Sequence, residues 1–477
     1  MANVLAIDQG TSATKALVVS DEGKVLGESS APVHPQAGAG GAVEQDPEEL
    51  LQSIVDAGKG ALAAAGVPVV AVGVGNQGET VLRWDRDTGR TFGPALSWQD
   101  RRAVDVTREL EGEADRLTEI TGLPLDPYFA GPKMAWLRRR DGAAGVITMI
   151  DAWTLQRLAG AFVTDASTAS RSLLLDLETT DWSDEACSIF GLEADEQPEV
   201  VDCDAQVGTT DAFGDPLPIT GLAVDQQAAL FAESCFEPGE AKCTYGTGAF
   251  ILATAGKRAP HSKARLAACV GWRLSGSATY CLDGQVYSAG SAVSWLQELD
   301  LIGQAADLDR LGSAGGEVVF VPSLAGLGAP FWAPEARGGW LGLSLASRRE
   351  DLVGAVVWGI AAQVASLARA MGGDMGRPLE RLRVDGGLTR SETLMQAQAD
   401  LLQAPVERYP SADATALGVG AFARLGAGVA GTPEEAVGPW EPEAVFEPKM
   451  PAAEAEERLG TWEAAAAALA ELSRHHN

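Results

Sequence analysis

The sequence has few of the residues that build metal centres and disulfide frameworks. Its 477 residues include six cysteines and four histidines, and no two cysteines form a C-x-x-C pair. A structural zinc site needs four such ligands at short spacings, so this class of site is not expected. Isolated cysteines of this kind usually act as small buried hydrophobic residues.

Basic residues are also scarce. The chain has 36 Lys and Arg against 66 Asp and Glu, which gives a net charge of −30. This charge repels nucleic acids and acidic membrane surfaces, so neither is an expected partner. A polyphosphate ligand would therefore have to be held locally, by a metal ion, backbone N–H groups and a few basic side chains.

Long apolar runs are missing too. There is no run of 18 apolar residues, and the N-terminus lacks a basic leader and a cleavage site. These absences predict a cytoplasmic protein without membrane insertion. The length exceeds what one ordinary core accommodates and predicts two or three domains, and the hydrophobic content of 46% is that of a globular protein.

The segment 220–250 combines an acidic residue with a glycine-rich turn. The apolar run Leu222–Val224 ends at Asp225, and a helix is expected to follow from Gln226 to about Cys235. A carboxylate between a strand and a helix lies at the mouth of an open α/β sheet, where ligands bind. The turn Tyr245–Gly248 exposes backbone N–H groups suited to phosphate oxygens. A candidate base followed by a candidate phosphate cradle indicates a phosphoryl transferase.

The same pattern opens the chain. The apolar run Val4–Asp8, a Gly-Thr-Ser turn and the run Lys15–Ser20 predict a hairpin with a phosphate-binding turn; the plain alternative is a hairpin with a decorated turn. A similar series recurs around the later turn, where Cys243–Tyr245 precedes it and Ala249–Ala255 follows. This repeat predicts two similar domains that face each other across a cleft.

Caps, periodicity and breakers predict the remaining elements. Helices are expected over 47–65, 134–140, 290–299, 351–371, 391–402, 414–426 and 452–474, strands over 25–29, 69–75, 81–84, 318–321, 381–384 and 405–409, and loops over 127–133, 326–332 and 338–343. A loop-rich subdomain is expected between 164 and 221.

Two charged side chains are interpreted individually. Lys133 is interpreted as a surface charge. Glu79, on a loop, is either a substrate contact or a solvated acid.

Nine short motifs in order resemble those of the FGGY family of carbohydrate kinases, and most closely its glycerol-phosphorylating members. The resemblance runs from Val4 to about Gly426. The motifs are DQGT at Asp8–Thr11, NQxET at Asn76–Thr80, WQxRR at Trp98–Arg102, DPYFxGxKxxW at Asp126–Trp136, DQQAALF at Asp225–Phe231, TYGTGxF at Thr244–Phe250, GLGAPxWxPxARG at Gly326–Gly338, VDGG at Val384–Gly387 and TALG at Thr415–Gly418.

The resemblance implies a two-domain α/β fold of the actin/hexokinase-like (ribonuclease H-like) class with a central catalytic cleft. Residues 1–226 would bind the polyol and phosphate, and residues 227–477 the nucleotide. The implied cofactors are ATP and Mg²⁺, the implied ligand is a small polyol, and the implied assembly is a homodimer or homotetramer. Closure of the cleft would exclude water, which otherwise competes for the phosphoryl group.

Matching the motifs residue by residue assigns roles to individual side chains. Asp225 would be the catalytic base and Asp8 the Mg²⁺ ligand, through water. Positions around the nucleotide and its phosphates are Thr11, Ser12, Ala13, Lys15, Thr247, Gly290, Ser294, Gly387 and Ser391. Polyol contacts would come from Gly78, Glu79, Tyr128, Asp225 and Gln226, with Trp98 and Phe250 as apolar walls.

Position 78 departs from the family pattern. The glycerol-binding motif is NQRET, and here a glycine replaces the arginine that would bind a hydroxyl group of glycerol. Two readings stay open: an enzyme that converts glycerol to glycerol 3-phosphate, with Arg83 or Arg102 supplying the guanidinium, or a kinase of a four- or five-carbon polyol or ketose of the erythritol, xylulose or ribulose type. Lys15 also replaces an arginine, and Ser294 and Ser391 replace amides.

Two further expectations concern activity and regulation. A non-catalytic nucleotide or sugar sensor on the same fold is the alternative from another class, but the candidate base and both phosphate turns are present. Family members that are controlled by a sugar bisphosphate resemble one another in a loop of glycine and basic residues before the DQQ motif. Here the interval Gly208–Ile219 has no Lys, Arg or His and contains two Asp, so neither bisphosphate inhibition nor histidine phosphorylation is expected there.

Overall fold

The computed structural model describes residues 2–142, 144–312 and 317–474. Its first large sheet has six strands in the order β14-β15-β6-β1-β2-β3. Their bounds are β1 (Asn3–Gln9), β2 (Ala13–Val19), β3 (Val25–Pro32), β6 (Val69–Asn76), β14 (Gly208–Thr210) and β15 (Leu217–Val224). β1, β6 and β15 run parallel, whereas β2 and β3 continue the sheet as an antiparallel meander. The central strands are almost wholly buried, as expected for strands covered on both faces.

The second large sheet has seven strands in the order β18-β19-β17-β16-β22-β23-β24. Their bounds are β16 (Glu240–Tyr245), β17 (Ala249–Gly256), β18 (Ala267–Leu274), β19 (Ser277–Val286), β22 (Arg381–Asp385), β23 (Val406–Arg408) and β24 (Ala444–Phe446). β16 and β17 form an antiparallel hairpin, as β1 and β2 do in the first sheet, and β16 also pairs in parallel with β22. The predicted duplication of the strand–turn–strand unit is therefore present in the fold.

Helices cover the two sheets and join them. Those of the first half are α1 (Pro47–Ala65), α2 (Val104–Glu109), α3 (Ala114–Thr121), α4 (Ala130–Asp141), α5 (Ile150–Ala159), α6 (Ala166–Ala169), α7 (Asp184–Ile189) and α8 (Asp225–Ala232). Those of the second half are α9 (Gly290–Glu298), α10 (Asp307–Leu311), α11 (Arg349–Met375), α12 (Glu392–Leu402), α13 (Ala414–Gly426), α14 (Pro433–Val437) and α15 (Ala452–Arg474). α1 begins where predicted, because the Asp46 carboxylate accepts a hydrogen bond from the Glu48 N–H at 2.9 Å.

Four smaller sheets accompany the two large ones in the described ranges. A five-stranded sheet in the order β4-β5-β8-β7-β9 adjoins the first lobe. Its strands are β4 (Gln36–Ala37), β5 (Val43–Gln45), β7 (Val81–Trp84), β8 (Ala95–Leu96) and β9 (Val146–Met149). Three two-stranded pairs are β10 (Val163–Asp165) with β13 (Glu199–Val201), β11 (Leu175–Asp176) with β12 (Asp181–Trp182), and β20 (Val319–Val321) with β21 (Gly339–Leu341).

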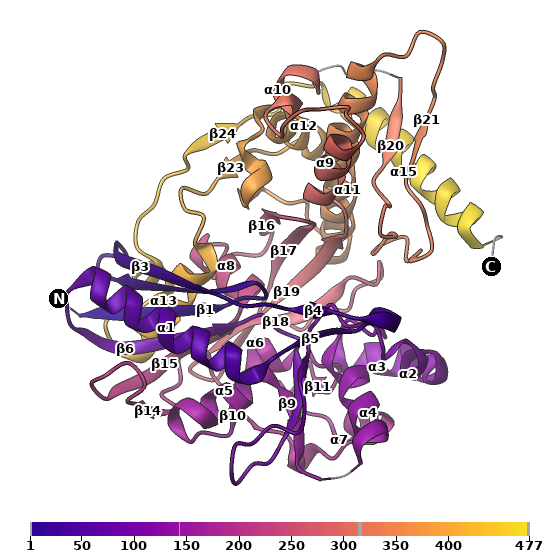
Figure 1. Ribbon diagram of the computed structural model, residues 1–477. Coiled ribbons are helices and arrows are strands. Elements are labelled where there is room, and N and C mark those ends of the chain that lie inside the picture. The colour runs from indigo at the N-terminus through magenta and orange to yellow at the C-terminus, as the bar shows by residue number, and fades with distance from the viewer. Residues whose placement is uncertain (1, 143, 313–316, 475–477) are drawn as a thin grey trace.

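The two large sheets form two lobes. In Figure 1 the first sheet combines the indigo to purple strands β1, β2, β3 and β6 with the magenta strands β14 and β15, and the red to orange part with α9 to α12 forms the opposite half. α13 lies between β23 and β24 of the second sheet in sequence but packs against β15, β1 and β6 of the first sheet and against α8. The first lobe thus includes a segment from late in the chain, and the division between residues 226 and 227 stays a prediction.

The core confirms the expectations drawn from composition. All six cysteines are free and buried. α11 is long and apolar enough to cross a membrane by length and composition, but 83% of its most apolar window is buried inside the protein. It is accordingly a core helix of the second lobe, packed against α12, α15 and β20.

Two predicted loops are wrong. α4 begins at Ala130, within the predicted loop 127–133, because Pro132 is only its third residue, where the backbone nitrogen needs no partner within the helix. The interval 338–343 contains the short strand β21. Its pairing with β20 is a tertiary contact, and a glycine-containing segment of this length shows no clear strand pattern in the sequence. The two-domain actin/hexokinase-like α/β architecture is the predicted one.

Candidate functional site

Three parallel strands bring the predicted acidic residues to one edge of the first sheet. Asp8 lies near the end of β1, Glu79 follows β6, and Asp225 follows β15. The register pairs Gln9 with Asn76 and Asn76 with Val224, so the three strands end level with one another. The carboxyl edge of a parallel sheet is where such folds bind ligands.

Asp225 is the first residue of α8. Its Oδ1 accepts a hydrogen bond from the Gln226 N–H at 2.6 Å. Burial raises the pKa of the Asp225 carboxyl, and its hydrogen bond with Gln226 and the charges of Lys242 and Arg171 act in the opposite direction. The group is therefore a stronger base than an exposed aspartate, yet the nearby cations favour its ionised form.

Lys242 is a site residue that the sequence did not indicate. It lies on β16 of the second sheet with a fully buried side chain. Its Nζ donates to Gln226 Oε1 at 2.5 Å and to Thr244 Oγ1 at 2.8 Å. It thereby ties the second lobe to the residue next to Asp225. A lysine in a strand gives no sequence signal for such burial, because most lysines are exposed.

Asp8 has the surroundings expected of a group that faces a cation. Burial, together with repulsion from Asp225 and Asp413, raises its pKa to about 7. Its Oδ1 is buried and has no hydrogen-bond partner among the described residues. No cluster of three or more His, Cys, Asp or Glu side chains suited to a metal occurs in the described ranges. The site therefore fits a cation that keeps most of its water and is bound by one carboxylate, as Mg²⁺ often is.

The first phosphate turn lies between β1 and β2. The Gly10 N–H donates to the Ala13 carbonyl at 3.1 Å, and Ser12 and Ala13 are exposed. Thr11 Oγ1 accepts a hydrogen bond from Trp98 Nε1 at 2.9 Å, so the predicted apolar wall also fixes the turn. Lys15 forms an ion pair with Asp413 at the start of α13, which places its ammonium group beside the same turn.

The second phosphate turn, Gly246–Gly248, contacts the start of α9. The Ala289 and Gly290 N–H groups donate to the Thr247 and Gly246 carbonyls at 3.0 Å each. Thr247 is exposed, and so is Ser294 on α9. The turn that carries Thr247 therefore contacts the start of the helix that carries Ser294, and both predicted nucleotide positions are open to solvent.

The turn after β22 completes this surface. Gly386 has φ = 93°, and a Cβ there would lie 2.4 Å from the Tyr245 carbonyl oxygen, so only glycine fits. Gly387 has open space beside it. Ser391 caps α12 and its hydroxyl donates to Asp309 Oδ1 at 2.7 Å, so it supports the turn; its predicted nucleotide contact stays a prediction.

Glu79 is buried, not solvated. Its side chain is 3% exposed and forms an ion pair with Arg171 Nε at 2.6 Å. Burial raises the pKa of Glu79 to about 7, against the opposing effect of Arg171. A buried carboxyl next to the candidate base fits a group that receives hydroxyl hydrogens from a substrate.

Aromatic rings adjoin this carboxylate. The rings of Trp98 and Tyr128 meet edge to face with centroids 5.8 Å apart, and Tyr128 meets Phe129 in the same way at 5.2 Å. The guanidinium of Arg171 lies 5.9 Å from the Tyr128 ring centroid. Two of the predicted polyol contacts, Trp98 and Tyr128, therefore form one wall.

The prediction that Lys133 is a surface charge is wrong. Its side chain is fully buried in α4, and its Nζ donates to the carbonyl groups of Pro127, Tyr128 and Phe129. Burial lowers the pKa of Lys133 to about 7. The lysine therefore fixes the backbone that carries Tyr128.

The backbone at position 78 is incompatible with most side chains. Gly78 has φ = 67°, and a Cβ there would lie 2.8 Å from Val224 Cγ2. Neither proposed substitute arginine reaches Glu79: Arg83 Nη1 donates to the carbonyls of Asp141 and Ala144, and Arg102 pairs with Asp100 and Glu44. The guanidinium beside Glu79 belongs to Arg171.

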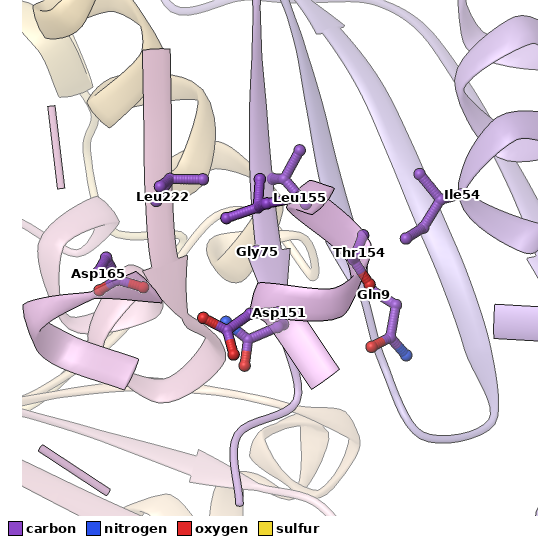
Figure 2. Close-up of a pocket in the computed structure, with 10 residues that line it drawn as sticks. Gln9, Ile54, Gly75, Asp151, Thr154, Leu155, Asp165 and Leu222 are labelled. Carbon is purple, nitrogen blue, oxygen red and sulfur yellow. The ribbon is translucent and has the colours of Figure 1, made fainter. Parts of the chain in front are cut away.

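A small internal cavity lies beneath this edge of the sheet. Its volume is about 10 Å³, and its walls include Gln9, Gly75, Asp151 and Asp165. Figure 2 shows Asp151 between Asp165 and Gln9. A cavity of this size holds one water molecule and no substrate, so it belongs to the support of the site.

Known proteins share this architecture over its whole length. The model of the N-terminal domain of the FGGY family of carbohydrate kinases matches residues 3–232, and that of the C-terminal domain matches residues 241–427. Glycerol kinase of Myxococcus xanthus is 40% identical over 486 aligned residues, covering 97% of this chain and 98% of that protein. Glycerol kinase of Aromatoleum aromaticum is also 40% identical and covers 97% of each.

Solved structures agree. Plasmodium falciparum glycerol kinase with ADP superposes with a TM-score of 0.91 at 29% identity and covers 98% of this chain and 97% of its own. A protein from Brucella ovis described as a xyloylose kinase has the same TM-score at 24% identity; the match covers 98% of this chain and 99% of that one, and it supports the fold alone. With both family models matched and full-length relatives at 40% identity, this chain belongs to the FGGY family of carbohydrate kinases.

Proposed function

We propose that this enzyme transfers the terminal phosphoryl group of ATP to a hydroxyl group of glycerol, giving glycerol 3-phosphate, with Asp225 as the general base. The observation that carries the proposal is the position of Asp225, a half-buried carboxylate at the edge of the sheet that also carries Asp8, Glu79 and the first phosphate turn. The full-length relatives named as glycerol kinases support the choice of substrate.

The residues divide the reaction between the two lobes. Glu79, Tyr128 and Gln226 orient the polyol so that one hydroxyl group faces Asp225. Asp225 accepts the proton as that oxygen attacks phosphorus, since an alkoxide does not form freely at neutral pH. The turns 10–13 and 246–248 face the phosphates with backbone N–H groups and hydroxyls, and the exposed surface at Gly387 takes the nucleoside.

Asp8 would hold Mg²⁺ through water. When bound, the ion would neutralise the negative charge that develops on the phosphates during transfer. Lys15, beside Asp413, would face the phosphates from the other side of the same turn. The non-catalytic sensor reading loses its basis, because both turns and the base are in place in a member of a kinase family.

A kinase of a four- or five-carbon polyol or ketose is the second candidate. The glycine at position 78 favours this candidate, because the arginine of the family is missing there. The left-handed backbone of Gly78 also means that a larger residue at this position would be strained. A homodimer or homotetramer in the cytoplasm remains our expectation for the assembly and its location.

The test is the substitution Asp225→Asn. The variant should fold and bind ATP but lose turnover of glycerol by a hundredfold or more, roughly the contribution of a general base. Asp211→Asn is the matched control, because Asp211 is exposed on the turn between β14 and β15. ATP affinity and the unfolding midpoint are measured on both. Near wild-type kcat in Asp225→Asn would remove the assigned base.

A further inference from the structure

A second cavity lies between the lobes, next to the aromatic wall. Its volume is about 30 Å³, and Tyr128 and Phe129 of the first lobe and Ala267, Asp283 and Trp332 of the second are among the residues around it. Such a volume holds about two water molecules, or one CHOH group. Tyr128 belongs both to this cavity and to the predicted polyol site.

Strand register places the cavity on the substrate side of the second sheet. Phe250 on β17 pairs with Gln285 on β19, and Leu252 pairs with Asp283. Because opposite residues share a face and faces alternate along a strand, Asp283 lies on the face that carries Phe250. Phe250 is the predicted wall of the polyol site, so Asp283 faces the same side as that wall.

Asp283 and Trp332 each leave one polar atom unused. Asp283 is 5% exposed, and its Oδ2 pairs with Arg171 Nη1 at 2.9 Å. Its Oδ1 is buried without a partner among the described residues, and so is Trp332 Nε1. Asp283 Oδ1 is an acceptor and Trp332 Nε1 is a donor, and one hydroxyl group can donate to the first and accept from the second. Unpartnered buried groups cost free energy unless a ligand or water satisfies them.

Arg171 connects this cavity with the proposed site. One guanidinium holds Glu79 through Nε at 2.6 Å and Asp283 through Nη1. It also donates to Cys269 Sγ at 2.8 Å. The carboxylates of Glu79 and Asp283 are thus fixed on either side of one rigid, planar group.

We propose that Asp283 Oδ1 and Trp332 Nε1 form a further hydroxyl-binding subsite, which accommodates the terminal CHOH unit of a four-carbon polyol. The inference rests on the proposed function, and it deepens the second candidate by naming tetritols as accepted substrates beside glycerol. The subsite binds the end of the polyol that is not phosphorylated, while Glu79 and Asp225 act on the other end.

The test compares erythritol and threitol with glycerol. Wild type should phosphorylate glycerol and at least one tetritol. Trp332→Phe removes the donor and keeps the ring, and Ala267→Val fills part of the cavity opposite Asp283. Each should lower the ratio of tetritol to glycerol kcat/KM about tenfold: Trp332→Phe loses one hydrogen bond, and Ala267→Val leaves less room for the additional CHOH unit. Trp340→Phe is the matched control, because its Nε1 donates to the Leu352 carbonyl at 3.1 Å, away from the cavity.

The outcomes separate the subsite from the proposed function. Two results would overturn the subsite and leave the function standing. One is turnover of glycerol without turnover of a tetritol, and the other is a ratio of tetritol to glycerol kcat/KM within twofold of wild type in both cavity variants. A cavity that holds only water gives one of these results. If no polyol is phosphorylated, the function fails, and calorimetric titration with erythritol and threitol then decides. Tetritol binding that Ala267→Val weakens supports the subsite, and no binding overturns it.

Discussion

At the scale of single residues, the site is built from buried and half-buried charged side chains that lie close to one another. Glu79, Asp225 and Asp8 are acids whose pKa values burial raises, and Arg171 and Lys242 are buried cations that oppose this effect at Asp225. Acids and bases whose surroundings shift their pKa values in this way are typical of catalytic sites. The balance of charge should therefore control the pH at which the base is active.

Lys242 gives a direct test of that balance. The charge of Lys242 lowers the pKa of Asp225, so Lys242→Met should raise that pKa and move the acidic limb of the kcat profile to higher pH. Activity should consequently fall more at pH 6 than at pH 8. The measurement is kcat for glycerol between pH 5 and 9.

The control for Lys242→Met is Lys257→Met. Lys257 Nζ also donates to a threonine hydroxyl, Thr279 Oγ1 at 2.8 Å, but it lies outside the site. Its pH profile should follow wild type. An equal loss of activity at every pH in Lys242→Met would indicate that Lys242 only positions Gln226.

At the scale of elements, the turn between β6 and β7 is the most constrained part of the polyol site. Gly78 and Glu79 have φ values of 67° and 42°, and the Gly78 N–H donates to Asn76 Oδ1 at 2.9 Å. A tight turn of this kind aims Glu79 at Arg171. The cost of placing another residue at 78 must therefore be separated from the effect of its charge.

Gly78→Arg, compared with Gly78→Ala, makes this separation. Both variants carry the strain of a left-handed backbone, about 1–2 kcal/mol, and should unfold at lower temperature than wild type. Only Arg adds a guanidinium, so relative to Gly78→Ala it should raise kcat/KM for glycerol about tenfold or more. The readouts are kinetics on glycerol and erythritol and the unfolding midpoint. Equal kinetics in the two variants would show that Arg171 already supplies the needed charge.

The hairpin of β14 and β15 concerns regulation. It covers the interval Gly208–Ile219 without a basic side chain, and Arg157 on the neighbouring helix α5 is paired with Glu48. Without cations the hairpin should not hold a bisphosphate. We expect fructose bisphosphate at physiological salt to leave glycerol phosphorylation unchanged. A saturable inhibitory titration would contradict this expectation.

At the scale of the whole molecule, stability should depend on Asp151. This residue lies in the internal cavity of Figure 2; Thr164 Oγ1 donates to its Oδ2 at 2.6 Å, and its Oδ1 has no partner among the described residues. Burial raises its pKa from 3.8 to about 7. The neutral form is thus favoured in the folded state, so this stability is complete below pH 3.8 and is lost as the pH rises through 7.

Asp151→Asn should remove that pH dependence. The amide oxygen still accepts from Thr164, and no charge has to be buried at neutral pH. Compared with wild type, the variant should gain more stability at pH 8 than at pH 4.5, up to about 4 kcal/mol for a shift of this size. Denaturant unfolding at both pH values measures it, with Asp211→Asn as the exposed control. A gain that is the same at both pH values would point to packing instead of ionisation.

The sequence by itself determined many of the helices and strands and some of the residues at their ends. The strand that carries Asp8, the strand that ends just before Asp225, the helix capped by Asp46, the repeated hairpin and the long core helix follow from local patterns, because caps, turn residues and apolar periodicity act within a few residues. The motif order also identified the family, since each motif keeps its own local chemistry.

Only the tertiary structure decided which charges meet. Arg171 reaches Glu79 across 92 positions of sequence, Lys242 reaches Gln226 from the other lobe, and Lys133 turns inward to three carbonyls although a lysine usually lies in water. Burial of a charge depends on partners brought together by folding, and the free energy of that burial is set by their distances. No local pattern records those distances, which is why the cavity at Asp283 and Trp332 emerges only from the folded chain.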